Sequence, residues 1–416
     1  MRLSKVLLRA LGVEGTVVDD VRLDDDRDEL IFEVRPDGRG GKRSRCGVCG
    51  RICPRYDAGR RRRWRALDLG TIKTWLEAEA PRVSCPKHKV VVAEVPWARH
   101  DTRVTWGFED QVAWLATNTS KSAVCELMRI GWRTVGRIIK RVVGAFDGFD
   151  PLDGLRRIGI DEISHRKGHR YITVVVDHDS GRLVWAAPGR DKATVHAFFD
   201  ALGPDRTAAL QAVTADAASW IRTVVQDRCP QATLCMDPYH VVAWATDALD
   251  DVRRQVWNDA RRQGQNAVAK EVKGARYALW KNPEDLTSGQ KDKLAAIERT
   301  NRPLYRAYLL KEQLRQVFRL PAQAGIELLD EWLLWARRCQ IPPFVKLAKR
   351  IGRHKERIAA SLRLRLSNGI VESMNTKIRL IIRRAFGFHS PEALIALAML
   401  DLGGLCPPLP GRQARA

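Results

Sequence analysis

The sequence lacks any run of about 18 apolar residues, the length that a membrane-spanning helix needs. Its basic N-terminal stretch has only a broken apolar segment and no small-residue cleavage site, so we expect no signal peptide. Acidic residues are scarce as well, since 49 Asp and Glu stand against 72 Lys and Arg and leave a net charge of +23. This surplus predicts a polyanionic partner, most simply nucleic acid, and we expect no membrane partner.

The nine cysteines form an odd set, and most of them are scattered along the chain. Four of them, Cys46, Cys49, Cys53 and Cys85, fall in the first quarter. This distribution is typical of a metal site plus buried thiols in a reducing cytoplasm and argues against secretion. With 416 residues, of which 45% are hydrophobic, the chain can bury a sizeable core and is expected to form two or three domains.

A zinc-ligand spacing occurs within a β-rich N-terminal region, residues 1–110. Cys46 and Cys49 form one pair with two residues between them, and Cys85 and His88 form a second pair with the same spacing. Each pair fits a tight knuckle around one tetrahedral structural Zn²⁺, so we expect a zinc ribbon at about 44–95. Two alternatives remain: Cys53 as a substitute ligand, or Cys85 and His88 as unrelated loop residues.

The stretch 39–65 holds eleven Lys and Arg against one acid, Asp57. Such a run is either a solvated charged strand or a phosphate-binding surface. Like charges repel unless something neutralises them, so we favour contact with DNA phosphates. The candidate contact residues lie between the two zinc-ligand pairs and are Arg60, Arg61, Arg62 and Arg63.

Residues 111–150 predict a helix-turn-helix DNA-binding domain. A capped helix begins near Ser120, Gly131 supplies a turn, and 132–143 has the apolar periodicity of a second helix. A basic second helix suits the major groove, although any helical hairpin could give the same pattern. The candidate DNA contacts on the second helix are Arg133, Arg137, Lys140 and Arg141.

Residues 151–240 alternate compact apolar runs with amphipathic helices. The order is three meandering strands, helix, strand, helix, strand, which is the order of a ribonuclease H-like core. Asp161 lies on the first strand and Asp216 ends the fourth, so we expect their carboxylates to converge. A third acid, Glu372, is expected on a later helix. Each acid alone could be a strand-end acid, a helix cap or a solvated residue.

Three carboxylates gathered at one point need cations. Oxygen-only ligands favour Mg²⁺ or Mn²⁺, and two ions per site would clamp the attacking and leaving oxygens of a phosphodiester displacement. Asp237 and His240 could assist there, or could be a helix N-cap and a packed residue. Asn375, which follows Glu372 by three residues, is a further accessory candidate.

Four segments carry a resemblance to a known family. They are Ile158-Gly-Ile-Asp161-Glu162, Val213-Thr-Ala-Asp216-Ala, Met236-Asp237-Pro-Tyr-His240 and Ser367-Asn-Gly-Ile-Val-Glu372-Ser-Met-Asn375, which resemble the DDE transposases of bacterial insertion sequences, most closely the ISL-three family. The zinc-ribbon and helix-turn-helix patterns fit the same family. The resemblance implies a catalytic triad of Asp161, Asp216 and Glu372.

The resemblance also implies the organisation of the rest of the chain. We expect an α/β plus α protein in which a helical insertion, 241–366, interrupts the catalytic core. The core resumes in 367–405, and a flexible tail follows at 406–416. Arg383-Arg384-Ala385-Phe386-Gly387-Phe388 looks like the closing motif of the family, whereas His88 stands where a fourth Cys is more familiar.

The implied function is that of a transposase that binds the terminal inverted repeats of its element and catalyses Mg²⁺-dependent DNA cleavage and strand transfer. We expect it in the bacterial cytoplasm, associated with the nucleoid, as a dimer or higher oligomer on DNA. The main alternative is a DNA-binding regulator on a catalytically inactive transposase scaffold. A junction-resolving or RNA-cutting nuclease on the same core is a third reading.

Overall fold

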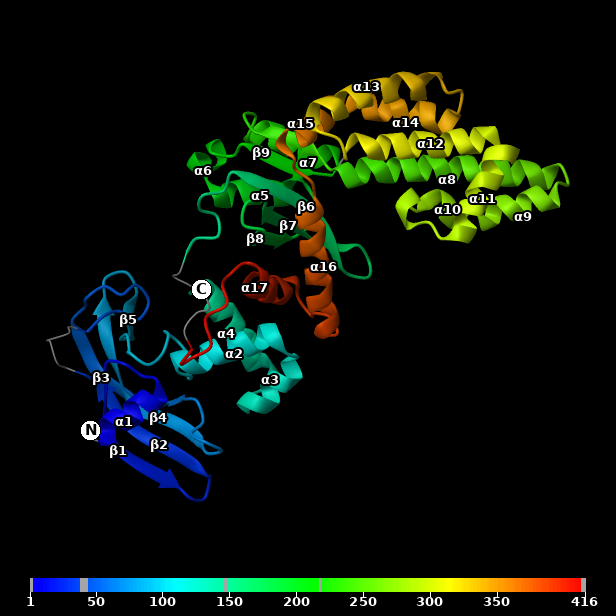
Figure 1. The fold of residues 1–416 in the computed structure, drawn as a ribbon. Helices are drawn as coiled ribbons and strands as arrows, with labels where there is room; N and C mark the ends of the chain where they lie inside the picture. Colours follow the sequence, from blue (N-terminus) through cyan, green and yellow to red (C-terminus); the bar gives the residue numbers. More distant parts are fainter. Residues whose placement is uncertain (1–2, 38–43, 146–148, 217, 413–416) are drawn as a thin grey trace. The chain divides into compact units, whose positions relative to one another are not determined.

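A computed structural model describes residues 3–37, 44–145, 149–216 and 218–412. Parts of the predicted basic stretch (39–43) and of the predicted tail (413–416) lie outside the described residues. The chain divides into two compact units, one formed by 1–149 with 384–416 and the other by 150–383 (Figure 1). Among the described helices, none is both long and apolar enough to span a bilayer.

The first unit is built on a five-stranded sheet with the order β1-β2-β4-β3, to which β5 adds by pairing with β4. A short helix, α1 (Leu3–Leu11), precedes the sheet. The core contains two tryptophans, Trp64 and Trp97, whose ring centroids lie 5.5 Å apart in an edge-to-face arrangement. The strands are β1 (Thr16–Asp24), β2 (Glu29–Pro36), β3 (Arg55–Arg65), β4 (Lys73–Cys85) and β5 (Lys89–Val92).

Four helices complete this unit: α2 (Trp106–Asn118), α3 (Lys121–Met128), α4 (Trp132–Gly144) and α17 (Pro391–Leu402). Ser120 caps α3 by accepting a hydrogen bond from the Ala123 N–H, as the sequence predicts. The apolar face of α4 is buried along its length. The helix α17 packs against α2 and α4, although the sequence-based division assigned it to the catalytic core.

The second unit contains a five-stranded sheet with the order β10-β9-β6-β7-β8. The strands β6, β7 and β8 form an antiparallel meander, and β9 and β10 then extend the sheet in parallel with β6. These strands form where the apolar runs predict them. Their bounds are β6 (Arg157–Arg166), β7 (Arg170–Asp177), β8 (Leu183–Pro188), β9 (Ala212–Ala215) and β10 (Thr233–Met236).

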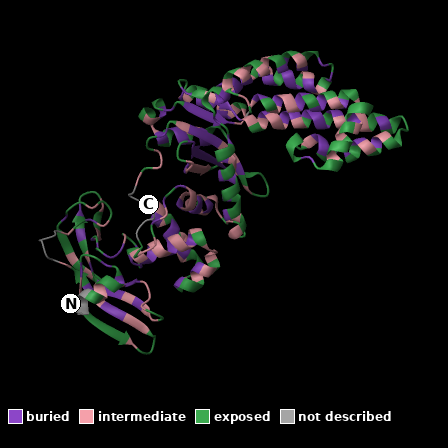
Figure 2. Ribbon diagram, in the orientation of Figure 1, coloured by how far each residue is buried: buried purple, intermediate pink, exposed green. Residues whose placement is uncertain are grey.

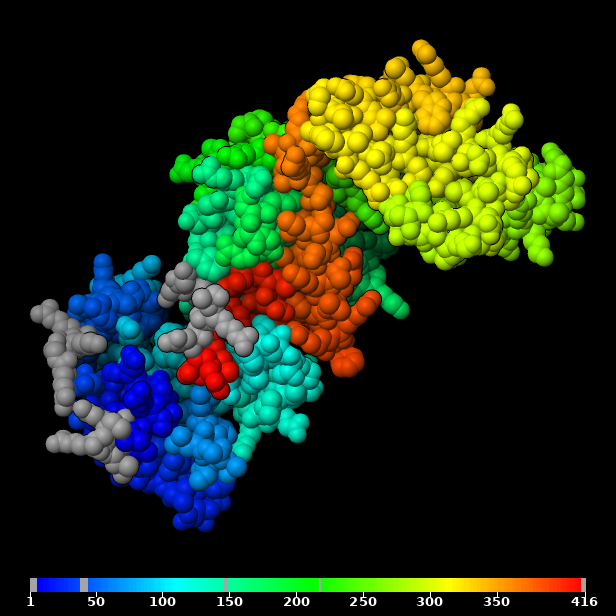
Figure 3. Space-filling model, in the orientation of Figure 1, coloured from blue at the N-terminus to red at the C-terminus, as the bar shows by residue number. Residues whose placement is uncertain are grey.

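One face of this sheet is covered by α5 (Lys192–Leu202) and α7 (Ser219–Arg228), with the short α6 (Pro204–Ala208) between them in sequence. The side chains of Ile158 and Ile160 pack on this face. Because strand side chains alternate, Gly159 and Asp161 belong to the other face. That face receives α16 (Gly369–Arg384), which with α15 (Lys355–Leu364) forms a continuous orange band in the space-filling view (Figure 3).

A helical bundle follows β10 and has its own apolar core, visible as buried stripes along the helices in Figure 2. Trp332 is fully buried there, and its indole N–H donates to the Leu310 carbonyl at 2.8 Å. The helices are α8 (Pro238–Arg262), α9 (Asn266–Gly274), α10 (Arg276–Trp280), α11 (Ser288–Thr300), α12 (Arg302–Val317), α13 (Ala322–Arg338) and α14 (Pro342–Arg353), with a 3₁₀ turn at Pro283–Asp285.

Candidate zinc centre and active site

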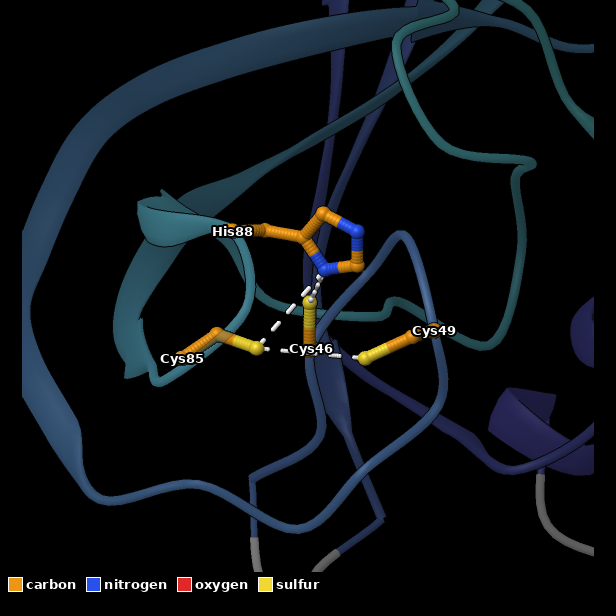
Figure 4. Close-up of side chains that lie close together, drawn as sticks. All are labelled: Cys46, Cys49, Cys85 and His88. Carbon is orange, nitrogen blue, oxygen red and sulfur yellow. Dashed lines mark hydrogen bonds between the residues drawn. The ribbon is translucent and has the colours of Figure 1, made fainter.

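Cys46, Cys49, Cys85 and His88 converge at one end of the first sheet (Figure 4). Their ligand atoms all lie within 4.8 Å of one another. The Cys46 and Cys85 sulfurs lie 3.6 and 3.7 Å from His88 Nδ1, and the Cys49 and Cys85 sulfurs are 3.8 Å apart. These four side chains therefore form a compact Cys₃His set of the kind that binds one tetrahedral Zn²⁺.

The local backbone prepares this cluster for a cation. Gly50 ends the first knuckle at φ +67°, a conformation that side chains with a Cβ rarely adopt. Burial by itself would raise the pKa of the Cys85 thiol, but the backbone N–H groups of His88 and Lys87 outweigh it and lower that pKa to about 6. A thiol with this pKa is largely thiolate at neutral pH, which is the form that ligates zinc.

Asp161 and Asp216 lie at the same level of the second sheet. The parallel pairing of β6 with β9 ends at Ile160 and Ala215; Asp161 is the next residue within β6, and Asp216 is the first residue after β9. Since residues at equivalent positions of paired strands point to the same face, the two carboxylates are neighbours. The pKa of Asp161 is consistent with this closeness, because the charge of Asp216 raises it in addition to burial, the main cause.

The helix α16 brings Glu372 to the same face. A Cβ on Gly159 would lie only 2.4 Å from Val371 Cγ2, so the helix packs directly on the backbone of β6. Next to this contact, Asn375 Nδ2 donates to Asp161 Oδ2 at 2.7 Å. Glu372 precedes Asn375 by one helical turn, and the two residues therefore share the helix face that meets Asp161.

Three carboxyl groups of this region, those of Asp161, Glu162 and Glu372, have raised pKa values. Burial is the main cause of the raised pKa of Asp161, and burial followed by the charge of Asp237 raises that of Glu372. Burial and then Asp216 raise the pKa of Glu162 to about 7, although strand alternation puts Glu162 on the opposite face from Asp161. The site therefore holds more negative charge than the chain neutralises.

The three acids do not form a closed ligand cluster. Within the described ranges, the Cys₃His set is the one group of three or more Cys, His, Asp and Glu side chains drawn together closely enough for a metal ion. Asp161, Asp216 and Glu372 share a face but stay further apart. Mutual repulsion of three carboxylates favours such an arrangement.

Asp237 and His240 are paired. Asp237 is 1% exposed and caps α8, accepting the Tyr239 N–H, and it also accepts the backbone N–H of Asn368 at 3.2 Å. Its other oxygen lies 2.7 Å from His240 Nδ1, and this hydrogen bond is the main reason that the pKa of His240 is raised. Asp237 is thus an N-cap, as one sequence alternative holds, and at the same time it anchors the segment before Glu372.

The predicted DNA-contacting side chains differ in their surroundings. Arg61 and Arg63 form ion pairs with acids of the first sheet, including Glu77, and Arg141 pairs with the buried Glu109. The remaining candidates have no ion pair in the described part of the chain and are exposed: Arg60, Arg62, Arg133, Arg137 and Lys140.

Sequence reasoning missed three residues near the acids. Gly159 shows its importance only through its contact with Val371, and Asn368 through its backbone bond to Asp237. Arg357 reaches the Asp216 carbonyl from α15. The Gly inside an otherwise continuous strand was the one available signal, because glycine within a strand often marks a close backbone approach.

Three family models match the chain in consecutive segments. A zinc finger of the transposases of IS204, IS1001, IS1096 and IS1165 matches residues 42–88, the helix-turn-helix domain of transposase family ISL3 matches 93–143, and the ISL3 transposase domain matches 158–398. The chain is 56% identical to the transposase for insertion sequence element IS1557 of Mycobacterium tuberculosis, over 99% of this chain and 98% of that protein. It is also 28% identical to the transposase for element IS1001 of Bordetella parapertussis, over 83% and 86% of the two chains. The chain therefore belongs to the ISL3 (ISL-three) family of insertion-sequence transposases.

Proposed function

We propose that this chain is the transposase of its own insertion sequence, and that Asp161, Asp216 and Glu372 form its catalytic site. The observation that carries this proposal is the register of β6 and β9, in which Ile160 and Ala215, the residues directly before the two aspartates, are paired. The bond from Asn375 to Asp161 supports the assignment of the third acid, because Glu372 lies one turn from it on α16. The reaction is DNA cleavage at the element ends followed by strand transfer.

The residues of this site fit Mg²⁺ or Mn²⁺, two ions per site. The donors are carboxylate oxygens, and Asn375 Oδ1 is buried with no hydrogen-bond partner in the described chain. The pKa of Asp161, raised by burial and by Asp216, indicates negative charge that a cation would compensate. When bound, the ions supply charge neutralisation and polarise the phosphodiester.

The other residues of the site act by positioning. Asn375 fixes the orientation of Asp161 through the 2.7 Å hydrogen bond. Asp237 ties the start of α8 to the segment before α16, and so holds Glu372 near the strand ends. His240, whose protonated form Asp237 stabilises, can donate a hydrogen bond to a phosphate oxygen of the substrate.

We propose the same domain division that the sequence predicts for DNA recognition and catalysis. A zinc ribbon within 1–110, with one structural Zn²⁺ on the Cys₃His set, and a helix-turn-helix within 111–150 bind the inverted repeats. The sequence assigns 151–240 and 367–405 to a ribonuclease H-like core, 241–366 to the insertion and 406–416 to the tail, and we keep this division except for α17, which packs with α2 and α4 in the first unit. Two element ends react together, so the active species is a dimer or larger assembly on DNA.

Zinc content tests the ligand assignment. We expect one zinc per chain in the wild type, none in Cys85→Ala, and one in Cys53→Ala, measured by atomic absorption on the purified proteins. Because zinc binding by small finger domains is worth about 10–16 kcal/mol, Cys85→Ala should also lose the cooperative unfolding of the ribbon. Cys53 is the matched control, since it is a buried neighbouring thiol outside the set. Zinc kept by Cys85→Ala, or lost by Cys53→Ala, contradicts the assignment.

The function itself is tested with a labelled duplex that carries the terminal repeat next to the coding sequence. We expect tighter binding than to a scrambled duplex, and cleavage at the element boundary in Mg²⁺ but not in EDTA. Specific binding with no cleavage in Mg²⁺ or Mn²⁺ would instead favour the regulator on an inactive scaffold.

A further inference from the structure

The helix α15 packs against β10 and sends two side chains to the carboxyl ends of the parallel strands β9 and β10, next to the candidate site. Ser361 Oγ donates to the carbonyl of Met236, the last residue of β10. One helical turn earlier, Arg357 Nη2 donates to the main-chain carbonyl of Asp216, directly after β9. Ligands of open α/β sheets bind outside the carboxyl ends of the strands, so Arg357 lies where a substrate is expected.

The guanidinium group of Arg357 has few hydrogen-bond acceptors among the described residues. Its Nε and Nη1 atoms are buried and have no hydrogen-bond partner in the described part of the chain. Across the described segments, no carboxylate forms an ion pair with it. Its one tether, the bond to the Asp216 carbonyl, is long at 3.4 Å and therefore weak. Burying a charged group without a partner is costly, and such a cost is typical of a group that awaits a ligand.

The surroundings of Arg357 are cationic. Burial is the main reason that its pKa is lowered, and the charge of Arg222 on α7 lowers it further. Arg350 and Arg353 on α14 belong to the same cluster, because both, together with Arg222 and Arg357, lower the pKa of His354 after burial. Asp216, a candidate metal ligand, opposes the charge of Arg357, and Asp247 opposes that of Arg350. The four arginines of this cluster therefore outnumber the carboxylates that act on them beside the site of phosphodiester chemistry.

We propose that Arg357 binds a DNA phosphate at or next to the scissile position. This inference rests on the proposed function and adds a substrate-binding residue to it. The side chain leaves its weak bond to the Asp216 carbonyl and donates its N–H groups to the nonbridging phosphate oxygens. An arginine suits this role because its donors match phosphate geometry and its charge is permanent.

Charge-neutral phosphates test the contact without any cleavage. Duplexes of the element end carry a methylphosphonate at successive positions across the boundary, and binding is measured in Ca²⁺. We expect one position where the neutral phosphate weakens wild-type binding about tenfold. Arg357→Gln should bind the unmodified duplex about tenfold more weakly and lose sensitivity at that position alone. Arg338→Gln, which removes an exposed charge from α13, should keep the wild-type pattern.

Cleavage and stability complete the test. In Mg²⁺, Arg357→Gln should cleave on the order of 10²-fold more slowly at saturating DNA, and Arg357→Lys should recover part of this loss. Neither substitution should lower the melting temperature, since the guanidinium makes no strong bond to the described residues of the DNA-free chain. The proposal is overturned if Arg357→Gln is sensitive to the methylphosphonate at the same positions as the wild type. It is also overturned if no position weakens the binding of the wild type. Wild-type binding without cleavage would contradict the transposase mechanism, while the methylphosphonate pattern would still report on Arg357.

Discussion

Replacement of Asp161 or Asp216 by asparagine, or of Glu372 by glutamine, is expected to lower single-turnover cleavage of the element end on the order of 10³-fold or more. Each substitution keeps the shape of the side chain but removes the negative oxygen that a hard cation needs. Binding of the same duplex should stay near the wild-type level, because the zinc ribbon and the helix-turn-helix supply it. The measurement is gel-resolved cleavage in Mg²⁺ beside a binding titration in Ca²⁺.

The same variants carry an internal control for folding. Burial raises the pKa of Asp161 in the folded chain. Ionisation of this carboxyl therefore destabilises the fold at any pH above the pKa that the group has in the unfolded chain. Asp161→Asn removes that charge but keeps one oxygen in place of the two that accept from Asn375 and from the Glu162 N–H, so its melting temperature in metal-free buffer should stay close to that of the wild type. Asp227→Asn, an exposed acid on α7, should leave both properties unchanged. If any of the three amide variants cleaved the duplex at a rate within tenfold of the wild type, the acid that it replaces would not be a catalytic residue.

Substitution of Gly159 by alanine is expected to separate α16 from the sheet and to disable the site without touching an acid. The new Cβ would lie 2.4 Å from Val371 Cγ2, closer than real contacts allow, and 3.0 Å from Thr214 Oγ1, which is also tight. Overpacking of this kind costs about 1–3 kcal/mol of the free energy of unfolding. Because the displaced helix carries Glu372 and Asn375, cleavage should fall more steeply than stability. Chemical denaturation and single-turnover cleavage measure the two losses.

A compensating change makes this prediction specific. Val371→Ala removes the methyl groups that the new Cβ would meet, so the double variant Gly159→Ala/Val371→Ala should recover a large part of both losses. Gly289→Ala is the matched control, since no atom lies within 4 Å of a Cβ at that position of α11. Equal losses in the single and double variants would mean that the contact between β6 and α16 does not hold Glu372 in place.

The sequence predicts the features that depend on local pattern. Asp161 and Asp216 stand out because each belongs to a compact apolar run, and such runs form buried strands. The zinc ligands can be predicted from their spacing, since the two-residue gap within each pair follows from the local geometry of a zinc knuckle and needs no tertiary partner. The buried face of α4 follows from the apolar periodicity of 132–143 in the same way.

The features that the sequence does not reveal depend on tertiary partners. Arg141 has the spacing of a groove-facing residue, but the buried Glu109 on α2 binds its charge. Arg61 is similar, because its acidic partners, Glu33 and Glu77, lie on β2 and β4. Arg357 looks like one of many cations on a helical segment until α15 is packed against β10. Only the register of packed elements distinguishes these arginines from their exposed neighbours.

Iron-mediated cleavage of the protein main chain tests the central claim most directly, namely that three acids from separate segments hold the catalytic metal. Fe²⁺ replaces Mg²⁺ in the DNA-bound protein, and peroxide then cuts the chain close to the bound ion. We expect cuts near Asp161, Asp216 and Glu372, competed by Mg²⁺ and absent in Asp161→Asn, while any cuts near the Cys₃His set persist in Mg²⁺. Cuts confined to one of the three segments, or unchanged in Asp161→Asn, would contradict a shared metal site.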